Sequence, residues 1–306
     1  MEKLIVSSAP HIHTKTTSRG IMLDVVIALL PATVAAVIIF GMKALGVIAA
    51  CVIAAVVAEA LFNLITGKPQ SIGDMSAVVT GLLLGLNLST NVHIWQCVVG
   101  SAFAIIVVKC LFGGLGRNFA NPAITARVFM LLAFSEVAGG AMPTIIDAAT
   151  TATPLEAVAA GGELPTLWQM FIGLRGGAVG EGCILAILLG YAYLVARKHI
   201  RWYVPAVFVG TVFVLSFIAS GDIVVTLYEL MGGGLFLGAV FMATDYVTTP
   251  ITNRGKIVFA LGCGIITFVI RQFCAYPEGV SFSILAMNIL TPYIEKWTAE
   301  KPLGGV

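Results

Sequence analysis

The chain has 306 residues, of which 59% are apolar and only 10% are charged, and its formal net charge is +2. Its mean hydropathy is +1.01. Soluble domains carry about 25% charged residues, so this composition excludes a soluble domain and predicts an integral membrane protein. The small net charge gives no indication of nucleic-acid binding.

The first twenty residues are polar and contain Lys3, Lys15 and Arg19. No apolar run followed by a small-residue cleavage site begins the chain, so we expect no ordinary secretory signal peptide. Residues 1–20 are predicted to form a cytoplasmic tail.

Ten apolar segments are long enough to cross a membrane, which takes roughly 20 apolar residues in a helix. We therefore predict an all-α membrane protein with about ten transmembrane helices, followed by a short cytoplasmic tail at 296–306. The third and eighth segments are the least regular, because they are short or rich in glycine. The segments are 21–40, 44–66, 76–92, 94–112, 122–138, 176–196, 202–219, 224–243, 256–272 and 279–295.

The basic residues predict the orientation of these segments. If the N-terminus is cytoplasmic, the outer side holds only Lys43, Arg175 and Arg271. Cytoplasmic loops are enriched in Lys and Arg, so we predict that both termini lie inside a bacterial or archaeal cytoplasmic membrane. Residues 139–175 then form an outer loop. The inner side collects Lys3, Lys15, Arg19, Lys68, Arg117, Arg197, Lys198, Arg201, Arg254, Lys256, Lys296 and Lys301.

The ten segments divide into two sets of five, at 21–138 and 176–295. Residues 80–86 of the third segment are similar to residues 233–239 of the eighth. An odd number of helices per unit inverts the second unit, so we predict two inverted five-helix repeats in a urea-transporter-like arrangement. Such folds bind ligands near the repeat interface, at interrupted helices. The alternative is that both stretches are ordinary glycine-rich packing faces.

Two polar segments, 113–123 and 243–255, lie on the predicted cytoplasmic side. One interpretation is helix capping, by Asn121 before one proline and by Asp245 or Thr249 before another. The other is a pocket that offers donors and acceptors to a planar heterocycle, because irregular backbone at membrane depth is tolerated where it lines a cavity. The candidate residues of this pocket are Arg117, Asn118, Asn121, Asp245 and Thr249.

The centre of the outer loop reads Asp147-Ala-Ala-Thr-Thr-Ala-Thr153-Pro-Leu-Glu156. One interpretation is a helix start, with Thr153 as the N-cap and Glu156 as its partner in a capping box. The second is that Thr153 carries a phosphate ester, since a helix N-terminus favours an anion. Both can hold together.

Residues 147–153 resemble the Asp-x-x-(Ser/Thr)-Gly-Ala-Thr signal at which a flavin transferase links FMN through its phosphate to threonine. Thr150 keeps the hydroxyl of that signal, and Thr151 stands where the family usually has glycine. The whole chain resembles the RnfD/NqrB family: the D subunits of Rnf complexes and the B subunits of sodium-pumping NADH:quinone oxidoreductases. The resemblance implies covalent FMN on Thr153, in a motif with Asp147, Thr150, Thr151 and Ala152.

The same resemblance implies a non-covalent riboflavin, which we expect in the polar pocket described above. It also implies membership in an enzyme complex that passes electrons between ferredoxin and NAD and translocates Na⁺ or H⁺. This chain would relay electrons without a catalytic residue of its own. The implied partners are a second outer-facing FMN subunit, cytoplasmic iron–sulfur and NAD-binding subunits, and the flavin transferase.

Two further features are open to more than one interpretation. Glu59 is an acidic residue inside an apolar segment, and it either pairs with Arg127 or lines an ion path. The six cysteines are scattered singly without a C-x-x-C spacing, so we expect buried side chains and no metal site made by this chain.

The competing function is a channel or secondary transporter for a small polar solute, because a fold does not decide a function. A solute channel would not need the threonine motif of the outer loop.

Overall fold

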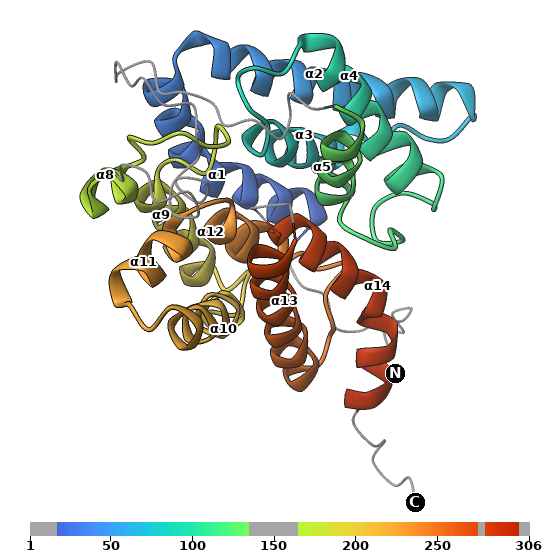
Figure 1. The fold of residues 1–306 in the computed structure, drawn as a ribbon. Helices are drawn as coiled ribbons and strands as arrows, with labels where there is room; N and C mark the ends of the chain where they lie inside the picture. Colours follow the sequence, from blue (N-terminus) through green and yellow to red (C-terminus); the bar gives the residue numbers. More distant parts are fainter. Residues whose placement is uncertain (1–16, 135–164, 275–278, 300–306) are drawn as a thin grey trace, which may run out of the picture.

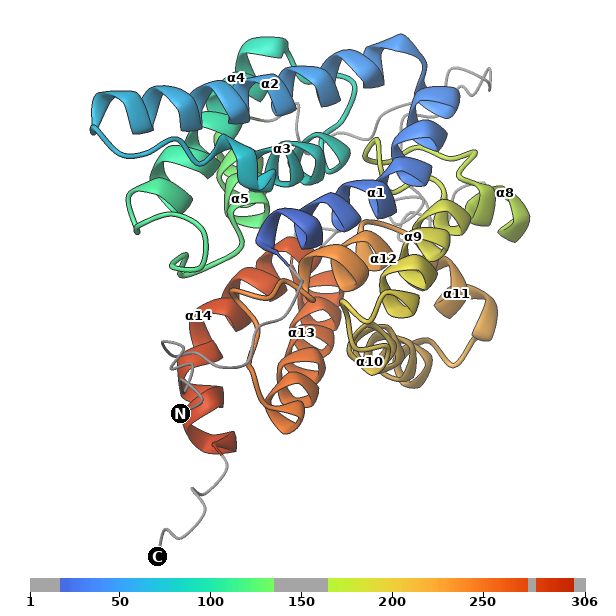
Figure 2. The ribbon, with the colours of Figure 1, turned by 180° about the vertical axis from the view of Figure 1, so that it is seen from behind.

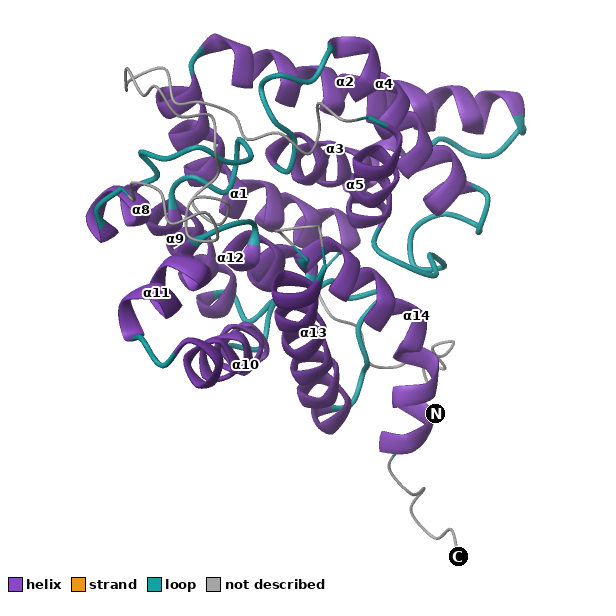
Figure 3. Cartoon of the chain, viewed as in Figure 1, coloured by secondary structure: helices purple, strands orange, loops and turns teal. Residues whose placement is uncertain are grey.

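The computed structural model describes residues 17–134, 165–274 and 279–299. Every regular element in these ranges is helical, and they contain no β-strand (Figure 3). The all-α prediction is therefore confirmed for the described part of the chain. The outer-loop motif, from Asp147 to Thr153, lies outside the described residues.

The first half of the chain forms seven of these elements. They are α1 (Ser18–Phe40), α2 (Met42–Ile65), η1 (Ile72–Asp74), α3 (Ser76–Leu86), α4 (Ile94–Ala102), η2 (Phe103–Cys110) and α5 (Pro122–Ala133). The described part of the second half begins at residue 165. It contains α8 (Leu167–Ile172), α9 (Ile184–Ala196), α10 (Tyr203–Ser220), α11 (Ile223–Met231), α12 (Leu235–Leu237), η3 (Gly238–Met242), α13 (Asn253–Phe273) and α14 (Val280–Thr298). The segments η2 and η3 are π-helical.

Four described helices, α1, α2, α10 and α13, are long and apolar enough to cross a membrane. A fifth span results if α11 and the α12–η3 segment, which meet at a bend of 62°, are counted as one. The chain is thus a multi-pass membrane protein. The number of ten helices and their two inverted repeats stay predictions.

Helix α1 runs between two groups of helices (Figures 1 and 2). The group α2–α5 lies on one side of it and the group α9–α14 on the other, and α1 contacts both α3 and α9. The contact with α9 is close at Gly190, where an added Cβ atom would lie 2.2 Å from the carbonyl oxygen of Ala28. The two halves of the chain therefore pack on opposite sides of α1.

Two predicted segments are shorter as helices than expected. Helix α3 ends at Leu86, so the prediction of a helix over 76–92 is wrong for its last third. The N–H groups of Val179 and Gly180 donate to the carbonyl oxygens of Leu88 and Leu86, over 2.9 and 2.7 Å. Carbonyl groups at a helix end need such partners, and the second half of the chain supplies them. The segment predicted at 176–196 correspondingly becomes helical only at Ile184.

The eighth predicted segment is broken at Gly232–Gly234, between α11 and α12. Gly233 has a φ of 62°, which favours glycine. The guanidinium group of Arg271 donates to the carbonyl oxygens of Glu229 and Gly232, over 2.6 and 3.1 Å. Side chains that satisfy freed backbone groups in this way make a broken helix tolerable in a membrane.

The glycines of the third segment pack closely against α2. A Cβ atom on Gly81 would lie 2.6 Å from Cα of Val52, and one on Gly85 would lie 2.9 Å from Cα of Ile48. These distances agree with the interpretation of this stretch as a packing face.

The cysteines follow the expectation in part. Cys51, Cys97, Cys110 and Cys263 are buried and Cys183 is half-buried. Cys274 is exposed, so the expectation of a buried side chain is wrong there. It directly follows Phe273, the last residue of α13, which is itself exposed.

Candidate functional site

The two polar segments predicted from the sequence meet in the fold. The side-chain nitrogen of Asn121 lies 3.4 Å from Oδ2 of Asp245, although 124 positions separate the two residues. With its amide oriented to suit both neighbours, Asn288 of α14 donates to the carbonyl oxygen of Thr248 and accepts from the backbone N–H of Asn121, each over 3.1 Å. The loop before α5, the loop after η3 and α14 therefore form one polar junction.

The two capping interpretations have different outcomes. Asn121 is the N-cap of α5, where its Oδ1 accepts from the backbone N–H groups of Ala123 and Ile124. Helix α13 is capped by Thr252, so the capping role considered for Asp245 and Thr249 is wrong. The Asp245 carboxylate does not cap a helix. It accepts hydrogen bonds from its own loop and from Asn121.

Asp245 organises the loop after η3. Its carboxylate accepts from the backbone N–H of Val247 over 3.4 Å and from the hydroxyl of Thr248 over 3.2 Å, and its carbonyl oxygen accepts from the hydroxyl of Thr249 over 2.6 Å. Burial raises the pKa of the Asp245 carboxyl, and the bonds from Val247, Thr248 and Tyr246 oppose that rise. A carboxyl group with a raised pKa stays protonated to a higher pH, and the protonated form can donate a hydrogen bond through its O–H group.

A cavity of about 70 Å³ brings Asn118, Asn121 and Asp245 together against apolar side chains of α3 and η3. A second cavity of about 460 Å³ lies beside it and contains Thr249 in its wall. Arg117 lines neither of the two. The walls that the cavities share are formed by His199, Ile200, Thr244 and Tyr246.

The residues of the first cavity suit a heterocycle with both donors and acceptors. Oδ1 of Asn118 is buried and has no hydrogen-bond partner among the described residues, and such an atom is costly unless a ligand or a water satisfies it. The volume of this cavity alone is below the roughly 300–1,000 Å³ typical of ligand pockets. A tricyclic ring with a side chain would therefore have to extend into the second cavity.

A cluster around Asp24 holds the wall between the cavities. The Asp24 carboxylate lies 2.5 Å from Nε2 of His199 and accepts from the hydroxyl of Tyr193 over 2.8 Å and from the guanidinium of Arg197 over 2.9 Å. The hydroxyl of Tyr246 donates to the carbonyl oxygen of His199. These bonds tie α1, the end of α9 and the loop after η3 together. From the sequence, the only signal of this cluster was an acidic residue at the start of an apolar segment.

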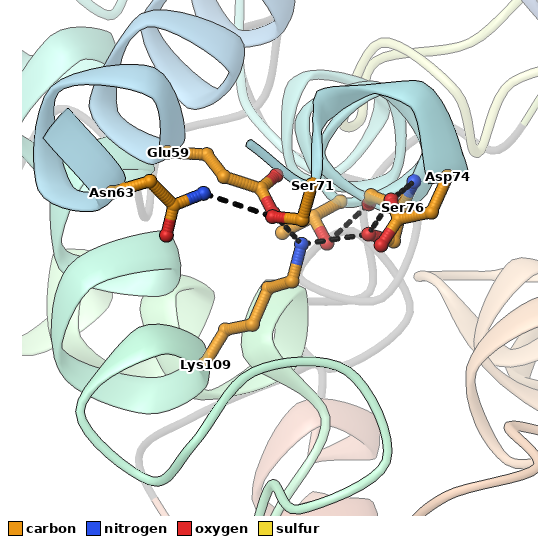
Figure 4. Close-up of polar contacts among 7 residues, drawn as sticks. Glu59, Asn63, Ser71, Asp74, Ser76 and Lys109 are labelled. Atoms are coloured by element: carbon orange, nitrogen blue, oxygen red, sulfur yellow. Dashed lines mark hydrogen bonds and ion pairs between the residues drawn. The ribbon is translucent and has the colours of Figure 1, made fainter. Parts of the chain in front are cut away.

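Glu59 forms an ion pair with Lys109. The predicted alternative of a pair with Arg127 is therefore wrong. Oε1 of Glu59 lies 2.8 Å from the lysine Nζ, and the two side chains are only 1% and 3% exposed. Figure 4 shows Lys109 reaching from η2 toward Glu59, which comes from α2, and toward the start of α3. The pair thus joins three elements in the interior.

Hydroxyl groups extend this ion pair in both directions (Figure 4). The Ser71 hydroxyl donates to Glu59 and accepts from the amide of Asn63 over 2.9 Å. Lys109 also donates to Oγ of Ser76 over 2.6 Å, and the Ser76 hydroxyl donates to Asp74. Lys109 and Ser76 both line the first cavity, so the network ends at the wall of the candidate site.

Comparison with known proteins identifies the family to which the chain belongs. The sequence profile of the NQR2, RnfD, RnfE family matches residues 5–304. The chain belongs to this family.

Individual members of the NQR2, RnfD, RnfE family are similar over almost their full length. The chain is 45% identical to the D subunit of the "Na(+)-translocating ferredoxin:NAD(+) oxidoreductase complex" of Acetobacterium woodii, and the match covers 98% of this chain and 95% of the relative. It is 40% identical to the D subunit of the "Proton-translocating ferredoxin:NAD(+) oxidoreductase complex" of Clostridium ljungdahlii, with 98% and 96% covered. It is 33% identical to the D subunit of the "Ion-translocating oxidoreductase complex" of Halorhodospira halophila, with 97% and 94% covered.

Family membership rests on the whole chain and not on the threonine motif. The motif residues Asp147, Thr150, Thr151, Ala152 and Thr153 lie outside the described residues. Covalent FMN on Thr153 therefore stays a prediction, as does a riboflavin in the polar cavity.

Proposed function

We propose that this chain is the flavin-carrying D subunit in the membrane part of an ion-translocating ferredoxin:NAD⁺ oxidoreductase complex, in which it relays electrons. The observation that carries the proposal is the full-length similarity to proteins named as the D subunits of such complexes. The names of two relatives give different coupling ions, Na⁺ in one and protons in the other. The proposal therefore concerns the electron relay and assigns no ion.

The proposed anchor of the first flavin is Thr153. Its hydroxyl oxygen would form the phosphate ester with FMN, and Asp147, Thr150, Thr151 and Ala152 would be the signal for a flavin transferase. In this role Thr153 holds the cofactor at the outer face and neither gives nor takes a proton. Bound flavin supplies electron transfer, while the protein supplies position and exclusion of water.

The proposed site of a second, non-covalent flavin is the cavity at the junction of the two loops. Asn118 offers an Oδ1 without a partner among the described residues, Asn121 offers the amide N–H that does not reach Asp245, and Asp245 offers a buried carboxyl group. Thr249 lines the adjacent cavity, which is large enough for a sugar-alcohol chain. Because the first cavity is small, riboflavin would have to extend across both cavities, and any part played by Arg117 stays a prediction.

The proposed orientation places both termini in the cytoplasm and Thr153 on the outer side, following the distribution of Lys and Arg. The outer flavin would then face a second outer FMN subunit. The cytoplasmic loops around the riboflavin cavity would face iron–sulfur and NAD-binding subunits. These partners are proposed from the family resemblance.

The test of the covalent flavin uses protein purified from its native host and run on a denaturing gel. We expect a fluorescent flavin band in the wild type and no fluorescence in Thr153→Ala. Fluorescence that persists in Thr153→Ala would contradict Thr153 as the anchor and move the anchor to Thr150 or Thr151. A dark wild-type band, in a host shown to contain the transferase, would contradict the covalent flavin and favour a channel or transporter.

A further inference from the structure

The ammonium group of Lys109 forms two hydrogen bonds within the described part of the chain. It donates to Oε1 of Glu59 over 2.8 Å and to Oγ of Ser76 over 2.6 Å. A lysine ammonium has three N–H groups, and no third bond of Lys109 is formed within the described residues. Lys109 lines the first cavity together with Ser76 and Thr80. A third N–H group therefore remains for a ligand that reaches Lys109 from the cavity.

The burial of this charge needs a reason. Lys109 is 2% exposed and Glu59 is 1% exposed, and desolvating two charges costs several kcal/mol per ion before their attraction is counted. Apolar side chains of similar size often serve stability equally well or better. Lys109 also lies in the π-helical segment η2, and π-helical turns occur frequently at functional sites. Packing alone is therefore a weak explanation for this pair.

Two other ionisable side chains that line the cavity, His199 and Asp245, also have polar partners. His199 is held by the Asp24 carboxylate, and Asp245 is held by its own loop and by Asn121. The carboxylate that holds Lys109 does not line the cavity. Lys109 thus forms part of the cavity wall, whereas its partner Glu59 does not.

We infer that Lys109 contacts the flavin of this cavity and favours its reduced form, and that Glu59 is a positioning residue that holds the ammonium and partly offsets its charge. The inference rests on the proposed riboflavin site. A neutral flavin that takes up two electrons and one proton gains one net negative charge. Reduced ferredoxin, named for the relatives, is a suitable class of electron donor, and water supplies the proton. A nearby ammonium stabilises that charge, and a nearby carboxylate opposes it.

The test measures the reduction potential of the non-covalent flavin in the full-length chain. All variants carry Thr153→Ala, so that the cavity holds the only flavin of the chain. Glu59→Gln keeps the shape of the side chain and removes the opposing charge, so the potential should rise. Glu59→Gln combined with Lys109→Met removes both charges, so the potential should fall below that of Glu59→Gln and of the parent. The double variant leaves no unpaired buried charge, whereas Glu59→Gln leaves the buried ammonium without its carboxylate. If Glu59→Gln does not fold, the comparison of the double variant with the parent tests the inference.

The matched control is Lys68→Met, which removes one positive charge elsewhere on the chain. Lys68 is exposed, its ammonium lies 5.2 Å from the centre of the Phe62 ring, and it lines neither cavity. The potential of this variant should equal that of the parent. Between Glu59→Gln and the double variant we expect at least a ten-fold change in the equilibrium constant of reduction, which is about 30 mV for a two-electron couple.

The outcomes separate the inference from the function on which it rests. Acid-releasable flavin in the parent protein, with potentials in the order Glu59→Gln, parent, double variant from high to low, supports the inference. Releasable flavin with the same potential in all four proteins overturns the inference and leaves the riboflavin site standing. A parent protein without releasable flavin overturns the riboflavin site and the inference together.

Discussion

At the scale of single residues, the Asp245 carboxylate stabilises its own loop and also lines the candidate site. It closes the loop after η3 through Val247 and Thr248, and it also meets Asn121 from the other half of the chain. Asn121 likewise combines two tasks, because one amide atom caps α5 and the other reaches Asp245. The capping role of Asn121 is therefore confirmed and is compatible with a place in the predicted pocket.

The raised pKa of Asp245 predicts a pH dependence of stability. In the unfolded chain this carboxyl ionises near its usual pKa of about 4, whereas burial delays its ionisation in the folded protein. Between these two pKa values the unfolded state has already lost the proton and is favoured, so wild-type stability falls as the pH rises through this window. Asparagine does not titrate. Relative to wild type, Asp245→Asn should therefore become more stable as the pH rises.

Thermal unfolding in detergent, from about pH 4 to about pH 8, measures this difference. We expect the midpoint of Asp245→Asn minus that of wild type to increase with pH until the carboxyl of the folded protein has ionised, and to stay constant above that pH. A difference that is constant over the whole range or that decreases with pH would show that burial does not control the Asp245 carboxyl.

At the scale of elements, close helix contacts depend on individual glycines. Gly190 of α9 lies against α1, and an added Cβ atom would come within 2.2 Å of a carbonyl oxygen and within 2.8 Å of the Phe241 ring. Gly210 of α10 is also inside a helix, but nothing lies within 4 Å of its Cβ position. Both glycines lie inside an apolar helix, and they differ in the atoms that surround the position of an added Cβ.

Alanine substitutions at these positions should have effects of opposite sign. Gly190→Ala should destabilise the protein by about 1–3 kcal/mol, the usual cost of overpacking, because the contact is with rigid backbone. Gly210→Ala should stabilise it by about 0.5–1 kcal/mol, because alanine loses less backbone entropy in a helix. Thermal unfolding of both variants in one detergent checks this pair. Equal effects of the two substitutions would refute a close α1–α9 contact at Gly190.

At the scale of the whole molecule, α1 separates the two halves of the chain, and contacts across it build the candidate site (Figures 1 and 2). Asn118 and Asn121 come from the first half, whereas Asp245 and His199 come from the second. A site of this kind exists only when both halves are assembled. Its position relative to the membrane follows from the orientation of the helices.

The predicted orientation can be tested at the two ends of α2. Lys43 and Lys68 are exposed and lie near opposite ends of this 24-residue helix. In a Cys274→Ser background, which removes the exposed native thiol, Lys43→Cys should react with a membrane-impermeant maleimide in intact cells. Lys68→Cys should react only after the cells are opened. The reverse pattern would invert the whole topology and place Thr153 in the cytoplasm.

The sequence by itself determined that the chain is a helical membrane protein and where most of its helices lie. Helices α1, α2, α10 and α13 agree closely with predicted segments, because burial of a long apolar run in lipid depends only on that run. The N-cap at Asn121 and the polar character of the two loops are equally local. The family resemblance, carried by the whole chain, is confirmed.

The tertiary structure alone decided where helices stop and which polar groups meet. Helix α3 ends at Leu86 because backbone N–H groups at Val179 and Gly180, remote in the chain, serve as hydrogen-bond partners there, and α11 breaks where Arg271 satisfies the freed carbonyl groups. Glu59 could have paired with Arg127 by sequence position, but packing brings Lys109 to it. Such choices depend on distances between segments that are far apart in the sequence, and no local pattern of residues encodes those distances.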